Sequence, residues 1–147
     1  MATLKSVDTE DLQLVLEICM IIPQSPEPWV EYKIEYHTGT FNIKLWRDNL
    51  PQDRCSGFKK LLDGINSIIK GQKDSIEYEA IEPDYEIKIV FNKPTEANPE
   101  GYYLVTLWRD LGNLEEGVYG LDALGLRLVT DKKNLIKFYT QLKKELD

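Results

Sequence analysis

Leu45-Trp46-Arg47-Asp48 occurs a second time at Leu107-Trp108-Arg109-Asp110, and two of the three tryptophans of the chain lie in these copies. Each copy ends an alternating run of apolar and polar residues. Each run also follows a Glu-Pro pair with an aromatic residue close behind, at 27–29 and at 82–85. A segment that recurs together with its flanks indicates a repeated structural unit. The repeat therefore predicts an architecture and not a reaction.

Strands are predicted wherever apolar and polar residues alternate. The expected strands are 12–22, 29–37 and 40–48 in the first half, and 76–80, 85–92, 102–110 and 121–129 in the second. Thr38-Gly39 predicts a hairpin turn between two of them, and the polar stretch 93–101 predicts a longer hairpin loop. Most neighbouring strands are therefore expected to pair antiparallel.

Two helices are predicted from apolar stripes at helical spacing. The first stripe is Phe58, Leu61, Leu62, Ile65, Ile68 and Ile69, and Gly71 is placed to end the helix. The second is Leu135, Phe138, Tyr139, Leu142 and Leu146, with Thr130 or Asp131 as the capping residue.

These elements predict one domain over 1–147, because no flexible linker separates the halves and 147 residues suit a single core. The expected fold class is α+β, with a mostly antiparallel sheet of about seven strands and two helices on one face or at one end. The predicted order is βββα and then ββββα, an internal pseudo-duplication of units 12–71 and 74–147.

The repeated tetrapeptide has two interpretations. In a strand, Leu and Arg point to one face, and Trp and Asp to the other. Trp46, Arg47, Trp108 and Arg109 could form equivalent ligand sites, or they could be two copies of one packing device, which duplication favours. The position of the tryptophans distinguishes the two interpretations. Rings that lie under the helices would be structural, whereas two exposed rings would be the best candidate for a binding site.

The charge of the chain is acidic, with a formal net charge of -7. This argues against nucleic-acid binding, where a basic patch supplies most of the affinity. Acidic residues concentrate between Asp74 and Glu86, with no basic residue among them: Glu77, Glu79, Glu82 and Asp84. They predict either a solvated outer face or a docking surface for a basic protein partner.

Catalytic and metal-binding residues are scarce. His37 is the sole histidine, so no histidine cluster exists within one chain, and no nucleophile or phosphate-loop motif occurs. Cys19 and Cys55 predict buried thiols and not a disulfide. We therefore expect no enzyme, no cofactor and no metal. The sequence also lacks a membrane-spanning run and a signal peptide, which predicts a cytoplasmic protein that does not bind membranes.

The second half resembles small bacterial proteins of the wall-associated-protein immunity (antitoxin) family and related uncharacterised families. The resemblance covers 58–146 and rests on one order of hydrophobic positions. These are Phe58, Leu61 and Leu62, the strands Tyr85–Phe91 and Tyr102–Trp108, Leu126 and Leu128, and then Asp131 with Leu135, Phe138 and Leu142. It implies a non-enzymatic protein that binds a toxin domain, and it transfers no functional residue.

Two functions from different classes stay open. The first is a small acidic protein-interaction module of immunity type, as monomer or homodimer. The alternative is a small-molecule binding protein with an aromatic-lined pocket between sheet and helices. A neighbouring toxin gene would favour the first, and a closed apolar pocket with convergent polar groups would favour the second.

Overall fold

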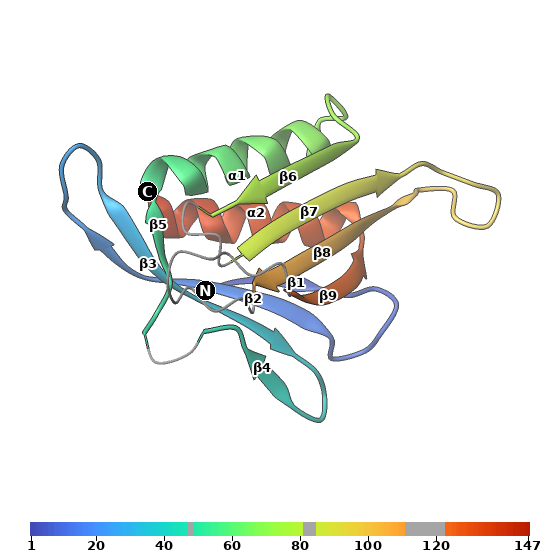
Figure 1. Ribbon diagram of the computed structural model, residues 1–147. Helices are drawn as coiled ribbons and strands as arrows, with labels where there is room; N and C mark the ends of the chain where they lie inside the picture. Colours follow the sequence, from blue (N-terminus) through green and yellow to red (C-terminus); the bar gives the residue numbers. More distant parts are fainter. Residues whose placement is uncertain (47–48, 81–84, 111–122) are drawn as a thin grey trace.

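The computed structural model describes the chain except for residues 47–48, 81–84 and 111–122 (Figure 1). The described residues form nine strands and two helices. The first sheet contains β1 (Ala2–Lys5), β2 (Gln13–Ile22), β3 (Trp29–His37), β4 (Asn42–Lys44) and β5 (Gln52–Arg54). The second contains β6 (Ser75–Glu79), β7 (Tyr85–Asn92), β8 (Tyr102–Asp110) and β9 (Ala123–Thr130). The α+β class is confirmed, but two sheets replace the single predicted sheet.

Strand order is simple in both sheets, because strands that follow one another in the chain pair antiparallel. The first sheet has the order β1-β2-β3-β4, with β5 paired to another stretch of β3. The second has the order β6-β7-β8-β9. A bulge in β2 between Ile18 and Met20 shifts the register with β3.

Both predicted helices are present. Helix α1 (Cys55–Ile69) buries Phe58, Leu61, Leu62, Ile65 and Ile68. Gly71 follows it with a φ of +70°, a conformation that glycine adopts without the strain of a side chain. Helix α2 (Lys132–Leu146) starts at Asp131, whose carboxylate accepts a hydrogen bond from the Asn134 N–H at 2.7 Å. Neither helix in the described part of the chain is long and apolar enough to cross a bilayer.

One hydrophobic core joins the two sheets and the two helices. Helix α1 packs against β5, β6 and α2, and α2 packs against β1 and β2. The rings of Tyr32 from β3 and Phe58 from α1 meet edge to face, with centroids 5.0 Å apart. The opposite face of the β6–β9 sheet carries none of these contacts, and we call it the outer face.

The sheets join where β1 meets β9. The Val7 N–H donates to the carbonyl of Val129 at 2.9 Å, and the Thr130 hydroxyl donates to the carbonyl of Lys5 at 2.7 Å. From β3, the Tyr36 hydroxyl donates to the Arg127 carbonyl at 2.5 Å. These bonds use backbone groups of β1, of Val7 beyond its end and of β9 that would otherwise be left unpaired.

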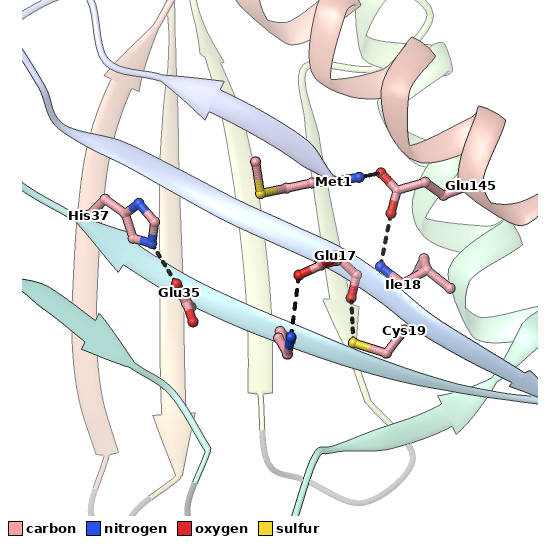
Figure 2. A network of polar contacts seen from close by, with 8 residues as sticks. Met1, Glu17, Ile18, Cys19, Glu35, His37 and Glu145 are labelled. Carbon is pink, nitrogen blue, oxygen red and sulfur yellow. Dashed lines mark hydrogen bonds and ion pairs between the residues drawn. The ribbon is translucent and has the colours of Figure 1, made fainter.

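Two side chains of α2, one helical turn apart, accept hydrogen bonds from backbone N–H groups of β1 and β2. The Gln141 side-chain oxygen accepts from the Thr3 N–H at 3.0 Å, and Glu145 accepts from the Ile18 N–H at 2.9 Å. Figure 2 shows Glu145 between Ile18 and the amino group of Met1, with which it forms an ion pair. We call this junction of β1, β9 and α2 the sealed margin.

The first copy of the repeated tetrapeptide corrects the prediction for 40–48. Of its described residues only Asn42–Lys44 form a strand, so Leu45 and Trp46 lie beyond it. Phe41, which alternation over 40–48 would place on the same face as the buried Leu45, is 58% exposed. Two unpredicted short strands, β1 and β5, give five strands before α1, so the predicted order βββα is wrong. The duplication itself stays a prediction.

Candidate interaction surface

Two of the four predicted acidic residues lie in β6, whose residues alternate between core and solvent. Glu77 and Glu79 are exposed, whereas Ile76 and Tyr78, which each precede one of them, are 9% exposed. This confirms that both carboxylates project from one face. Glu82 and Asp84 lie outside the described residues.

The neighbours of the two carboxylates give them different roles. On β7, Lys88 stands opposite Glu77 and its Nζ lies 2.5 Å from the Glu77 Oε1 atom. The hydrogen bond to Glu77 raises the pKa of Lys88, so this pair is charged and locally neutral. Glu79 instead faces Glu86 in the same register. Neither Glu79 nor Glu86 forms an ion pair within the described part of the chain.

An exposed tryptophan extends this acidic pair across the sheet. Trp108 on β8 stands opposite Glu86, and Gly125 on β9 stands opposite Trp108. Trp108 is 39% exposed. A Cβ atom at Gly125 would lie 2.5 Å from the Trp108 ring. The indole therefore packs directly over Gly125, and a larger residue at this position would displace it. We call Glu79, Glu86 and Trp108 the acidic row.

The backbone of β6 adds a second feature. The Ala80 N–H donates to Tyr85 at 3.1 Å and the Phe91 N–H donates to Asp74 at 2.8 Å, which fixes the antiparallel pattern. The even-numbered residues of β6 therefore bond to β7, and Ser75, Glu77 and Glu79 direct their N–H and C=O groups away from it. Within the described residues these groups have no hydrogen-bond partner. We call them the β6 edge.

A groove of about 700 Å³ separates the β6 edge from α1. All five residues of β6 line it on one side, and α1 lines it on the other, with Gly57 and Gly64 among its residues. An added Cβ at Gly64 would lie 3.1 Å from Ile76, so this glycine allows close packing of α1 on β6.

A buried polar contact holds β6 at the bottom of the groove. The Tyr78 hydroxyl donates a hydrogen bond to the carboxylate of Asp53 on β5, which is 0% exposed. Burial, and secondly this hydrogen bond, raise the pKa of Tyr78. A Cβ at Gly57 would lie 2.8 Å from Asp53, so glycine is required beside this pair. The contact links the two sheets beneath the open edge.

The tryptophans of the repeated tetrapeptide do not form equivalent sites. Trp108 lies on the outer face, whereas Trp46 lines a hollow of about 410 Å³ with Trp29, Tyr85 and Arg109. The Arg109 guanidinium lies over the Tyr85 ring, 4.8 Å from its centroid. Arg109 lies on the same face of β8 as the buried residues Tyr103, Val105 and Leu107, and Arg47 lies outside the described residues.

This hollow is aromatic, but its place differs from the predicted one. Its described lining comes from β3, β7, β8, Trp46 and the segment 49–52, and no residue of α1 or α2 is part of it. It therefore opens where the two sheets approach each other and not between a sheet and the helices.

No cluster of three metal-ligating side chains occurs in the described ranges. His37 bonds to Glu35 at 2.6 Å (Figure 2). Cys19 is exposed, which corrects the prediction of a buried thiol, and Cys55 is half-buried. Burial raises the pKa of Cys55, which lowers its thiolate fraction.

Sequence reasoning missed three features of this surface: Glu86, the alignment of Trp108 with the carboxylates, and the β6 edge. Alternation could have placed Glu86 and Trp108 on the outer face. Their alignment with Glu79 depends on strand register, which the sequence does not reveal.

Comparison of the chain with protein-family models, with curated proteins and with solved structures found no match in any of the three. The functional interpretation of this surface therefore depends on its geometry alone, and the resemblance to immunity proteins stays a prediction.

Proposed function

We propose that this protein is a non-enzymatic interaction module that binds a basic protein through the outer face of the β6–β9 sheet. The observation that carries the proposal is the acidic row, in which Glu79 and Glu86 face each other beside the exposed ring of Trp108. The immunity-like role, with a toxin domain as the basic partner, is the specific form of this proposal that the sequence resemblance suggests.

The acidic row has an energetic reason to bind a cation. Like charges directly opposite each other in a sheet destabilise it, and a lysine or arginine placed between Glu79 and Glu86 would reverse that interaction. The Trp108 ring, which leans over Gly125 on the side away from Glu86, offers a π face to a second cation of the partner, a contact worth about 0.5–2 kcal/mol. The net charge of -7 would also speed the encounter with a basic protein.

The test is a charge reversal with a matched control. Glu79→Lys with Glu86→Lys reverses the acidic row, and Glu96→Lys with Glu100→Lys makes the same change in net charge on the exposed β7–β8 loop. Each form captures proteins from native cell extract, mass spectrometry identifies them, and stopped-flow mixing with the purified partner gives association rates over a range of salt concentrations.

We expect the wild type and the loop control to retain one basic protein. The acidic-row variant should lose it, with slower association and a flatter salt dependence. Equal retention by both variants, equal loss by both, or capture of no basic protein by the wild type would each contradict the proposal.

The convergence of Trp29, Trp46, Tyr85 and Arg109 favours a second candidate function, the binding of a small planar anion. Aromatic faces and a guanidinium suit an aromatic carboxylate, and the Glu31 carboxylate in the same lining accepts a hydrogen bond from the Gln52 side chain. Benzoate and indole-3-carboxylate are suitable probes, with melting temperature and tryptophan fluorescence as measurements. A shift that Trp46→Ala abolishes and Trp108→Ala preserves would support this function, and the absence of any shift would exclude it for these ligands.

A further inference from the structure

We infer that the β6 edge binds an extended basic segment of the partner protein as an additional strand, placed in the groove beside α1. The inference rests on the proposed function and specifies its binding mode. Its basis is the combination, on one strand, of outward-facing carboxylates, an adjoining groove and backbone groups that have no partner among the described residues.

The backbone is arranged to receive a strand. Ser75, Glu77 and Glu79 each present an N–H and a C=O group away from β7, at the spacing that a neighbouring strand requires. An incoming strand would lie about 4.8 Å from β6, on the side where the groove lies. Main-chain bonds of this kind provide affinity in edge-strand recognition, and alternate side chains provide specificity.

The two faces of the groove define that specificity. Residues of the added strand that pair with Glu77 and Glu79 would project from the outer face. Lysine or arginine fits best beside Glu79, which faces Glu86, and the preference is weaker beside Glu77, which is paired with Lys88. The intervening residues would face α1, where small residues and one charge of each sign line the groove, so an uncharged side chain fits there: Ser56, Gly57, Lys60, Leu61, Asp63, Gly64 and Ser67. The expected segment therefore alternates basic residues with small or β-branched ones.

The edge is held in place before binding. Tyr78 is bonded to Asp53, and Ile76 packs on Gly64, so both inward side chains of β6 are fixed. A preformed edge loses little conformational entropy when a strand adds to it.

A second copy of this chain does not suit the same edge. An antiparallel β6–β6 pair centred on Glu77 would place Glu77 opposite Glu77 and Glu79 opposite Ser75, within a protein of net charge -7. Like charges directly opposite each other are destabilising, and charged residues on an edge strand are a known protection against self-pairing. The charge thus discriminates between a basic partner and the protein itself.

Proline at position 77 separates the backbone contribution from the charge contribution. The Glu77 N–H makes no bond to β7, so Glu77→Pro removes an edge donor and leaves the β6–β7 ladder bonds in place. Glu77→Ala is the matched control, because it removes the same carboxylate and keeps the N–H. The melting temperatures of both variants show whether the fold is retained.

The probe is a synthetic peptide of alternating lysine and valine, with its binding measured by NMR titration. We expect Glu77→Ala to weaken binding up to about fivefold, as for an exposed ion pair. Glu77→Pro should weaken it about five- to tenfold further, which corresponds to one lost hydrogen bond. A peptide N-methylated at alternate residues lacks the N–H donors that would bond to the β6 edge, so it should bind the wild type poorly when those residues face β6. This result does not depend on the folding of any variant.

The outcomes separate the two proposals. Equal binding by Glu77→Pro and Glu77→Ala, together with full binding of the N-methylated peptide, would overturn strand addition. Loss of peptide binding in the Glu79→Lys, Glu86→Lys variant would then still support the acidic row. Conversely, peptide binding that depends on the Glu77 N–H and survives the acidic-row reversal would support the edge and contradict the proposed function.

Discussion

The two edge strands of the β6–β9 sheet differ in whether their outward backbone groups are hydrogen-bonded. At β9, the carbonyl oxygens of Arg127 and Val129 accept hydrogen bonds from Tyr36 and Val7, and the strand joins the first sheet. At β6, the outward backbone groups of Ser75, Glu77 and Glu79 have no partner in the described chain, and a groove lies beside them. One margin completes the fold, and the other is available for a partner.

This difference separates stability from binding. Changes at the sealed margin should lower the free energy of unfolding, because buried side chains and backbone bonds are lost there. Changes at the β6 edge should leave the free energy of unfolding nearly unaltered and act on binding.

The largest effect is expected for Leu4→Ala in β1, against which α2 packs. Leu4 is 1% exposed, and truncation of such a leucine costs about 2–5 kcal/mol. The matched control is Val7→Ala, since Val7 is 51% exposed and should change the free energy of unfolding by less than about 0.5 kcal/mol. Urea denaturation measures both, and similar small losses for the two variants would show that the sealed margin contributes little.

An intermediate effect is expected for Asp53→Ala beneath the β6 edge. The variant leaves the buried Tyr78 hydroxyl without its acceptor, which costs about 1–3 kcal/mol. Tyr78→Phe in the same background should recover part of the loss, because the unsatisfied hydroxyl is removed. Additive losses in the double variant, measured by denaturation as a double-mutant cycle, would contradict a coupled pair.

Alkaline pH should destabilise the protein through the same tyrosine. Burial, and secondly Asp53, raise the pKa of Tyr78 above its ordinary value of 10.0, so its ionisation is disfavoured in the folded state. The stabilisation is complete below pH 10.0 and is lost as the pH rises above that value.

The pH dependence of the free energy of unfolding should become shallower in Tyr78→Phe. A residual slope is expected, because burial also raises the pKa of Tyr36 and of Tyr103. An identical slope in the wild type and in Tyr78→Phe would assign the alkaline loss to other groups.

The smallest effect is expected for Glu79→Ala. The exposed side chain faces Glu86, so its removal should stabilise the protein slightly, by less than about 0.5 kcal/mol. Denaturation curves that show a loss above about 1 kcal/mol would make this side chain part of the fold and weaken the contrast between the margins.

Much of the fold was predictable, because local patterns decide it. The stripes and caps of α1 and α2, and the alternation in β2, β3 and β6–β8, are confirmed. The segment 40–48 was mispredicted because alternation alone does not create a strand. The same edge of β3 pairs with two different strands. Glu35–His37 pair with Asn42–Lys44 of β4, and Trp29–Glu31 pair with β5, so β4 extends over three residues only.

The candidate site was predictable only in part. The alternation in β6 predicts the outward position of Glu77 and Glu79. The order of the strands, which the sequence does not reveal, makes β6 an edge and β7 its neighbour. The pairing of Glu79 with Glu86 and Trp108 depends on register across three strands, and the sealed margin depends on contacts between residues far apart in the chain.

Amide hydrogen exchange of the free protein, followed residue by residue by NMR, tests the difference between the margins most directly. The structure predicts fast exchange at Ser75, Glu77 and Glu79, and slow exchange at Ile76 and Tyr78 between them. Thr3 and Val7 at the sealed margin should also exchange slowly. Uniformly slow exchange along β6 would contradict an open edge, and fast exchange at Thr3 and Val7 would contradict a sealed one.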